Sequence, residues 1–128
     1  MRNYKELEVR QKAVTLAIEA YKATSHFPDA ERFGLTSQIR RASTSIAANI
    51  AEGWGRGTTK EYIQFLLIAR GSLMEFETHA IIGRKLNYVT HEQLGALQGQ
   101  IEEVGKMLNG LIQPLRRARA AQSISANP

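Results

Sequence analysis

Apolar residues recur every three or four positions along almost the whole chain, which is the spacing of amphipathic helices. In the segment 4–24 this spacing produces two stripes, one of larger and one of smaller apolar residues: Leu7, Val14, Ile18 and Tyr21, and Val9, Ala13, Leu16 and Ala20. Pro28 predicts the end of this first helix, because proline disfavours helical geometry in the residue before it. No segment alternates apolar and polar residues for long enough to predict a strand.

A second helix is expected after Asp29, a residue suited to cap a helix N-terminus. Its apolar positions continue at spacings of three and four: Leu35, Ile39, Ala42, Ile46 and Ile50. Gly53 is well placed to end this helix. The segment 53–57 reads Gly-Trp-Gly-Arg-Gly and is predicted to be a loop, because glycine is a poor helix former.

Two further helices complete the pattern. Thr58 and Glu61 have the spacing of a capping box, and a long helix is predicted over about 59–86. Thr90 and Gln93 repeat the capping pattern at the start of the last helix. The apolar residues of that helix alternate spacings of three and four without a break: Leu94, Leu97, Ile101, Val104, Leu108, Leu111 and Leu115.

Four helices joined by short connections predict an all-α fold, an up-down-up-down four-helix bundle in a single domain over residues 1–117. Pro114 is expected to bend or fray the end of the last helix. Residues 118–128 are small, polar and aperiodic, so they are predicted to form a disordered tail.

The third helix has more apolar surface than one bundle core needs. Beside its main apolar face it carries a second stripe: Ile63, Leu67, Met74 and Ile81. Because a helix that is apolar on two sides packs on two sides, this stripe is the predicted oligomer interface. Gly71 and Gly83 would let another helix approach closely. The alternative is that this helix lies centrally and that both stripes serve one core.

Length and composition narrow the class of protein. The 128 residues fit one domain, and an apolar share of 43% is typical of a folded chain. Because the chain has no cysteine, a disulfide framework, a thiolate zinc site and a catalytic thiol are excluded. The N-terminus lacks the apolar core of a signal peptide, and the longest apolar run, 65–69, is far shorter than a membrane span. A cytoplasmic location is therefore expected.

The basic charge is unevenly distributed along the chain. Lysines and arginines number 17 against 12 acidic residues, which gives a net charge of +5. Residues 1–25 and 26–60 each contribute +2 and residues 111–128 contribute +3, whereas 89–110 contribute −2. The cations of 26–60 and of the tail are the candidate binding residues. This distribution permits a nucleic acid as a partner. The predicted nucleic-acid contacts are Arg40, Arg41, Arg56, Lys60, Arg116 and Arg117.

Two interpretations remain open for the polar side of the second helix. Arg41, Ser45, Asn49 and Glu52 share one stripe, because their spacings are four, four and three. The stripe is either a binding surface, with Arg40 and Arg41 reaching phosphates, or a hydrogen-bonded network in which Glu52 pairs with an arginine.

The glycine loop also allows two interpretations. It leads into the N-terminus of the third helix, where exposed amides and the helix dipole favour an anion, and Arg56 and Lys60 add charge there. Alternatively it only joins two helices. Trp54 either stacks on a base or covers the edge of the core. The loop is not a P-loop, because a preceding strand and the Gly-Lys-Ser/Thr ending are missing.

Few residues suggest catalysis. The closest approach to the metal motif of bundle enzymes is Glu75 with His79, at a spacing of four instead of three and present once. No catalytic residue, metal site or cofactor is therefore predicted. An unrecognised carboxylate site would require Glu52, Glu75 and Glu102 to converge.

Several passages resemble a known family: residues 4–9 (Tyr-Lys-Glu-Leu-Glu-Val), 33–42 (Phe-Gly-Leu-Thr-Ser-Gln-Ile-Arg-Arg-Ala), 45–53 (Ser-Ile-Ala-Ala-Asn-Ile-Ala-Glu-Gly), 57–66 and 69–75. Together they resemble the four-helix-bundle proteins encoded within intervening sequences of bacterial 23S ribosomal RNA genes. The resemblance extends to about Leu115 and implies a bundle that assembles as a homopentamer. It also implies kinship with the accessory proteins of diversity-generating retroelements, basic bundles that bind nucleic acid and a reverse transcriptase. Arg10 stands where relatives usually have tryptophan.

The sequence and the resemblance together predict a non-enzymatic, oligomeric binding module that contacts RNA or DNA phosphates through a basic surface. The alternative is a protein–protein scaffold whose basic face binds an acidic partner, such as a polymerase or a reverse transcriptase. The expected partners are further copies of the chain and a nucleic acid or an acidic protein, without a membrane.

Overall fold

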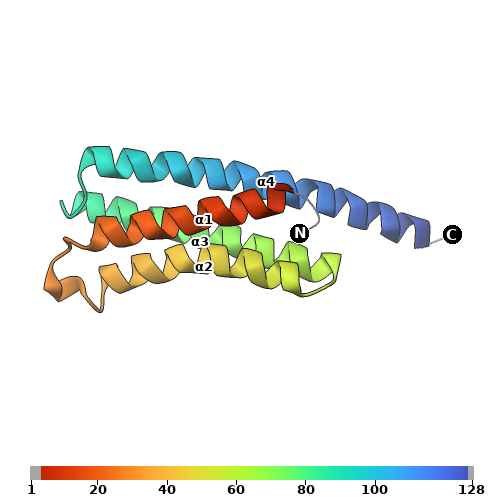
Figure 1. Ribbon diagram of the computed structural model, residues 1–128, viewed down its shortest axis with the longest axis horizontal. Helices are drawn as coiled ribbons and strands as arrows, with labels where there is room; N and C mark the ends of the chain where they lie inside the picture. Colours follow the sequence, from red (N-terminus) through yellow and green to blue (C-terminus); the bar gives the residue numbers. More distant parts are fainter. Residues whose placement is uncertain (1–3, 127–128) are drawn as a thin grey trace.

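Four antiparallel helices form the molecule, and they run up, down, up and down (Figure 1). The computed structural model describes residues 4–126, and their side chains as far as Gln122. The helices are α1 (Tyr4–Thr24), α2 (Leu35–Gly55), α3 (Thr59–Lys85) and α4 (His91–Ala126), and a short 3₁₀ helix, η1 (Asp29–Glu31), lies between the first two. Residues 4–126 contain no strand. The predicted all-α four-helix bundle is confirmed.

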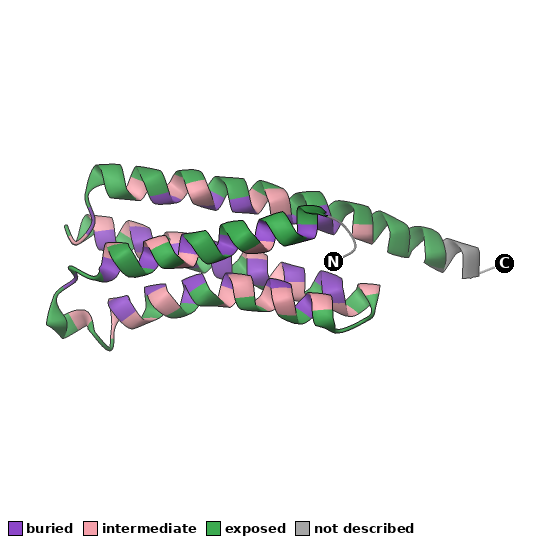
Figure 2. Ribbon diagram, viewed as in Figure 1, coloured by how far each residue is buried: buried purple, intermediate pink, exposed green. Residues whose placement is uncertain are grey.

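The core lies along the axis of the bundle, and each helix turns its buried side chains inward (Figure 2). On α1 the smaller stripe forms the core, because Val9, Ala13, Leu16 and Ala20 are all fully buried. The larger stripe lies on the solvent side of the same helix, where its residues keep between 38 and 51% of their surface exposed: Leu7, Val14, Ile18 and Tyr21. Large residues of the other helices, such as Tyr62 and Phe76, fill the centre. The small residues of α1 therefore allow this helix to pack closely against the large core residues of the other helices.

The predicted caps are present at the starts of α3 and α4 but not at the start of α2. Thr90 and Gln93 form a complete capping box, in which the Gln93 amide donates to Thr90 Oγ1 (3.1 Å) and the Thr90 amide donates to Gln93 Oε1 (2.8 Å). Thr58 Oγ1 caps α3 by accepting from the Glu61 amide at 3.2 Å. Asp29 does not cap α2: it opens η1, and Gly34 is the N-cap residue of α2, without a side chain to accept a bond.

Gly53 lies inside α2 and not at its end, since the helix continues for two more residues. A Cβ atom at Gly53 would lie 2.7 Å from the Cβ of Phe65, so α2 and α3 are in close contact here. Gly83 is similarly close to Val89 and Phe27, at 3.2 and 3.3 Å. Gly71, by contrast, has nothing within 4 Å in its own chain. Within the chain, Gly83 is thus packed against residues of the two connections, Phe27 and Val89, and Gly71 is open, so the expected approach of another helix stays a prediction for self-association.

The C-terminal part of α4 extends past the other helices (Figures 1 and 2). Its last fully buried residue is Ile112, and all residues from Arg116 to Gln122 are exposed. We call residues 116–126 the overhang. The predicted disorder of 118–128 is wrong over 118–126, which are helical, because alanine and arginine are strong helix formers even without an apolar stripe. Residues 127 and 128 lie outside the described residues. Pro114 is accommodated within the continuous helix.

Candidate nucleic-acid interface

Arg40 and Arg41 are neighbours in α2 but have different surroundings. The Arg40 guanidinium lies 4.5 Å from the centre of the Tyr21 ring, and its Nε donates a 2.9 Å hydrogen bond to Thr24 Oγ1. Thr24 Oγ1 in turn donates to the carbonyl of Ala20 at 2.8 Å. Arg41 is exposed and forms no ion pair among the described residues. Arg40 is therefore anchored on α1, whereas Arg41 is available to a ligand.

These two arginines line a groove of about 470 Å³ beside the start of α2, which we call the α2 groove. Of the described residues that line it, none is acidic, and the full set is Tyr21, Arg32, Phe33, Thr36, Ser37, Arg40, Arg41 and Thr44. The Arg32 guanidinium lies 5.3 Å from the centre of the Phe33 ring. The groove thus combines three arginines with two aromatic rings.

A second basic site lies where the start of α3 meets the end of α4, and we call it the α3–α4 cleft. It has a volume of about 510 Å³ and is lined by Lys60, Ile63, Gln64, Leu67, Arg116, Arg119 and Ala120. The antiparallel helices bring Lys60 close to arginines that lie 56 and 59 positions later in the sequence. None of the three cations forms an ion pair within the described part of the chain. Their charges are therefore uncompensated.

Arg56, in the glycine loop, has a partner of its own. Its Nε lies 3.2 Å from Glu52 Oε1, and its guanidinium lies 5.0 Å from the centre of the Phe65 ring. Gly57 gives the loop its turn with φ of +88°, a conformation that other residues rarely adopt. Trp54 is half-buried and packs against the core, with its ring edge toward Tyr62 at a centroid distance of 6.3 Å. Trp54 thus covers the edge of the core.

The six predicted cations do not form one continuous surface. Arg40 and Arg41 line the α2 groove, whereas Lys60 and Arg116 line the α3–α4 cleft. Because a helix rises 1.5 Å per residue, the fifteen residues from Arg41 to Arg56 separate the two ends of α2 by roughly 22 Å. Arg117 is exposed beside Arg116 and lines neither site.

Ser45 and Asn49, in the polar stripe of α2, form a hydrogen-bonded network that reaches α3. Ser45 Oγ lies 2.9 Å from Ser72 Oγ, and Asn49 Nδ2 donates to Ser45 Oγ at 2.9 Å and to the Ser45 carbonyl at 2.8 Å. Glu52 lies outside this network and pairs with Arg56. Ser45 and Asn49 are thus part of a network between two helices of one chain.

The predicted interface stripe of α3 is mostly covered by the chain itself. Ile63 is buried, and Leu67 and Ile81 are half-buried. Met74 alone of the four is well exposed, at 56%. The largest run of exposed apolar residues lies instead on α1, in the larger stripe described above.

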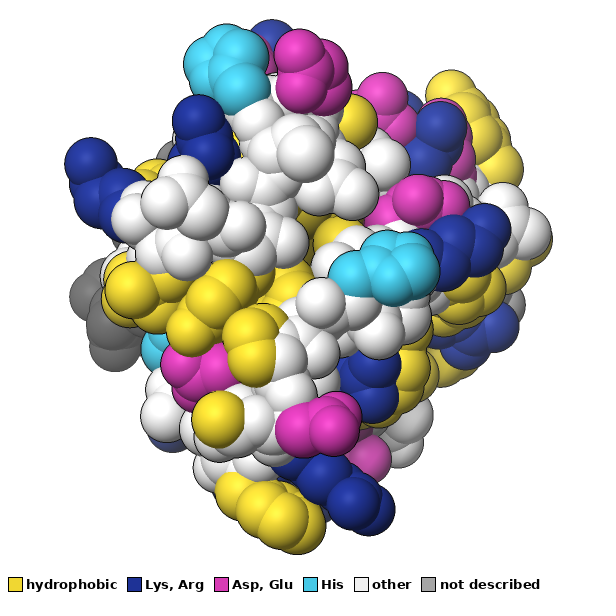
Figure 3. All heavy atoms as spheres, turned by 90° about the vertical axis from the view of Figure 1, so that its left-hand side faces the viewer, with side chains coloured by type: hydrophobic (Ala, Val, Ile, Leu, Met, Phe, Trp, Pro, Cys, Tyr) yellow, Lys and Arg dark blue, Asp and Glu magenta, His cyan; other side chains and the backbone are white. Residues whose placement is uncertain are grey.

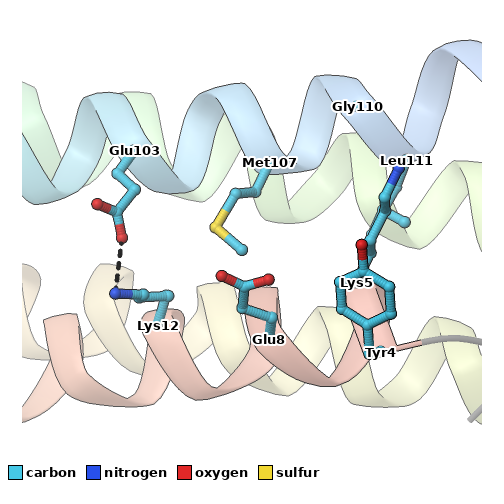
Figure 4. Close-up of a pocket in the computed structure, with 8 residues that line it drawn as sticks. All are labelled: Tyr4, Lys5, Glu8, Lys12, Glu103, Met107, Gly110 and Leu111. Atoms are coloured by element: carbon cyan, nitrogen blue, oxygen red, sulfur yellow. Dashed lines mark ion pairs between the residues drawn. The ribbon is translucent and has the colours of Figure 1, made fainter.

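Other surfaces of the molecule carry both signs of charge. In the groove between α1 and α4, Lys12 and Glu103 point toward each other, with their charged atoms 3.0 Å apart, and Glu8 lies alongside (Figure 4). The hydrogen bond to Glu103 raises the pKa of Lys12 above its usual value. The end of the bundle with the α1–α2 and α3–α4 connections also mixes acidic, basic and apolar side chains (Figure 3). An acid-free lining thus sets the α2 groove and the α3–α4 cleft apart from these two surfaces.

Each of the three carboxylates considered for catalysis has a basic or histidine neighbour on its own helix. Glu52 pairs with Arg56, Glu75 lies 3.5 Å from His79, and Glu102 pairs with Lys106, each partner being four residues further along the same helix. Among the described residues, no group of three histidine or acidic side chains has the geometry of a metal site. None of the described helices has an apolar stretch long enough to span a membrane.

A single domain of four antiparallel helices with acid-free basic sites defines a small, basic four-helix-bundle protein. Residues 5–110 match the family of 23S rRNA-intervening sequence proteins, and the chain belongs to that family. The fold is similar to the crystal structure of a protein of unknown function from the S23 ribosomal protein family of Bacteroides thetaiotaomicron. The two chains are 26% identical with a TM-score of 0.79, and the match covers 85% of this chain and 98% of the other. None of the curated proteins matches the chain.

Three residues that line the two sites are not among the predicted nucleic-acid contacts: Arg119, Arg32 and Phe33. Arg119 was assigned to a disordered tail, although its spacing of three from Arg116 places both on one face of a helix. Arg32 and Phe33 lie before α2, and their side chains meet Tyr21 of α1 only in the folded chain. The exposure of Phe33, at 88%, is visible in the structure alone.

Proposed function

We propose that this protein is an oligomeric module that binds nucleic acid and contacts its phosphates through the α3–α4 cleft. The observation that carries the proposal is that Lys60, Arg116 and Arg119 gather in one acid-free cleft without an intramolecular partner. Like charges repel when they are brought together, and a bound anion removes that repulsion. The N-terminus of α3 adds the positive end of a helix dipole close to Lys60.

The proposal predicts a steep dependence of binding on salt. Three phosphate contacts correspond to a slope of about −2 to −3 in a plot of log affinity against log salt, so affinity should fall roughly 20- to 40-fold per chain between 50 and 200 mM salt. Fluorescence anisotropy with labelled single-stranded and duplex RNA and DNA measures this slope. A wild-type protein that binds none of these probes at 50 mM salt would contradict the proposal.

The double variant Arg116→Gln/Arg119→Gln tests the site itself. Losing two of three contacts should weaken binding on the order of 100-fold at 50 mM salt and flatten the slope to about −1. The matched control is Lys22→Gln/Lys106→Gln, which removes the same charge from lysines paired on their own helices, and it should change affinity less than about 3-fold. If both double variants lost affinity equally, binding would depend on the net charge of the protein and not on the α3–α4 cleft. Capture of an acidic protein that survives nuclease treatment would favour the scaffold function instead.

Self-association is the second part of the proposal. The exposed larger stripe of α1 has spacings of seven, four and three, which is the pattern of a helix seam, and α1 carries more of the exposed large apolar side chains than any other helix within the described residues. Five copies would carry a charge of about +25, which strengthens long-range attraction of a polyanion. Each copy would also bring one α3–α4 cleft, so contacts on one nucleic acid would multiply.

We expect the wild-type chain of 14.3 kDa to elute as an assembly of about 72 kDa, five copies, in size-exclusion chromatography with light scattering. Ile18→Glu places a charge in the middle of the α1 stripe and should shift the mass toward a single chain. Leu86→Glu is the control, because Leu86 is similarly exposed at the end of α3, away from the stripe. An assembly that withstands Ile18→Glu would exclude this interface.

A further inference from the structure

The α2 groove differs from the α3–α4 cleft by its aromatic rings. Phe33 keeps 88% of its surface exposed and Tyr21 keeps 45%, and each ring has an arginine guanidinium next to it. Aromatic rings and guanidinium planes are the surfaces on which unpaired bases stack in proteins that bind single strands. The groove volume of about 470 Å³ is within the range of roughly 300–1,000 Å³ of small-ligand pockets.

The polar groups of the groove suit a phosphate. Among the described residues, neither the Arg41 nor the Arg32 guanidinium forms an ion pair, and the Arg32 guanidinium lies next to the Phe33 ring. The backbone amides of Thr36 and Ser37, in the first turn of α2, have no acceptor among the described residues, because Gly34 offers no capping side chain.

An independent observation also points to a ligand. Thr36 is 91% buried, and its Oγ1 has no hydrogen-bond partner within the described part of the chain. Buried hydroxyls are almost always hydrogen bonded, so Thr36 Oγ1 keeps an unused hydrogen-bonding capacity in a residue that lines the groove. Glu31, the nearest acidic residue in the sequence, is engaged: it accepts bonds from the Leu35 amide and from the Tyr88 hydroxyl, both at 3.2 Å.

We propose that the α2 groove holds an unpaired nucleotide, with its base stacked on the exposed ring of Phe33 and its phosphate on Arg41, Arg32 and the free amides of α2. This inference rests on the proposed function, since it names the form of nucleic acid that is bound. A duplex presents its phosphates but hides the faces of its bases. The groove therefore selects single strands, whereas the α3–α4 cleft contacts phosphates of either form.

The test compares a labelled 12-nucleotide single strand with a 12-base-pair duplex of the same sequence, as RNA and as DNA, at 50 mM salt. Because one stacked base contributes about 1–3 kcal/mol, Phe33→Ala should weaken single-strand binding roughly 5- to 150-fold and duplex binding less than 2-fold. Phe33 is almost fully exposed, so the variant should keep its circular dichroism spectrum and Tm. Tyr4→Ala is the control: it removes another exposed aromatic ring, from the groove that Glu8 and Glu103 also line, and should leave both affinities unchanged.

A second measurement uses uridine monophosphate alone and records chemical shifts of the backbone amides. The largest shifts are expected at Thr36 and Ser37, and they should be lost in Arg41→Gln. A Phe33→Ala variant whose single-strand to duplex affinity ratio equals that of the wild type would overturn the inference while leaving the proposed function intact. If the wild type binds no probe at all, both the inference and the proposed function are wrong.

Discussion

Replacing Gly53 with alanine is expected to lower the Tm by about 4–12 °C, because overpacking a tight contact costs roughly 1–3 kcal/mol, and 1 kcal/mol corresponds to about 4 °C for a chain of this size. The new methyl group would lie 2.7 Å from Phe65 Cβ and 3.1 Å from Tyr62 Cδ1. Both neighbours are fixed at the start of α3, so the two helices must move apart. Scanning calorimetry measures the change.

Gly99→Ala is the matched control for this prediction. Gly99 is exposed in the middle of α4, and nothing lies within 4 Å of an added Cβ atom. Since alanine is the better helix former by about 1 kcal/mol, this variant should raise the Tm by a few degrees. If Gly53→Ala raised the Tm as Gly99→Ala is expected to do, α2 and α3 would not be in close contact at Gly53.

Truncating Leu16 to alanine is expected to have the largest effect of any change on α1. Leu16 is fully buried against the core, and removing a buried leucine side chain costs about 2–5 kcal/mol, or roughly 8–19 °C in Tm. The cost combines lost burial with the cavity that remains. Chemical denaturation should show the same loss as a lower midpoint with an unchanged slope.

Two neighbouring positions make this test specific for one face of α1. Thr15→Ala should change the free energy of unfolding by less than about 0.5 kcal/mol, because Thr15 is exposed. Val14→Ala, in the larger stripe, should cost much less than Leu16→Ala within a single chain. If Val14→Ala proves the more costly change, the core would use the opposite face of α1 and the proposed self-association surface would be wrong.

The helices could be predicted from the sequence because their signals are local. The predicted segment 4–24 coincides with α1, and the predicted 59–86 differs from α3 by one residue. The choice between the two stripes of α1 could not be made, since it depends on the volume that the other helices leave free. The end of α4 has no apolar stripe, a pattern that predicts disorder, whereas alanine and arginine favour a helix even without such a stripe.

The sequence predicts that the candidate site is basic, but it does not predict which basic residues lie together in the folded chain. Charge counting found Lys60 and Arg116, and the antiparallel topology brings them into one cleft. It also grouped Arg40 with Arg56, which lie at opposite ends of α2 and which the structure separates. Adjacent residues of a helix differ by about 100° in direction, so Arg40 and Arg41 have different surroundings although they are neighbours. Tertiary contacts of this kind have no local signal.

The overhang of α4 places three arginines, Arg116, Arg117 and Arg119, beyond the residues that form the core. Its side chains from Arg116 to Gln122 are exposed, and Pro114, which cannot donate a backbone hydrogen bond, stands between them and the last buried residue, Ile112. Substitutions of these exposed side chains should therefore leave the packing of the core unchanged. The charge of this exposed segment can therefore be altered by substitution while the stability of the bundle is conserved.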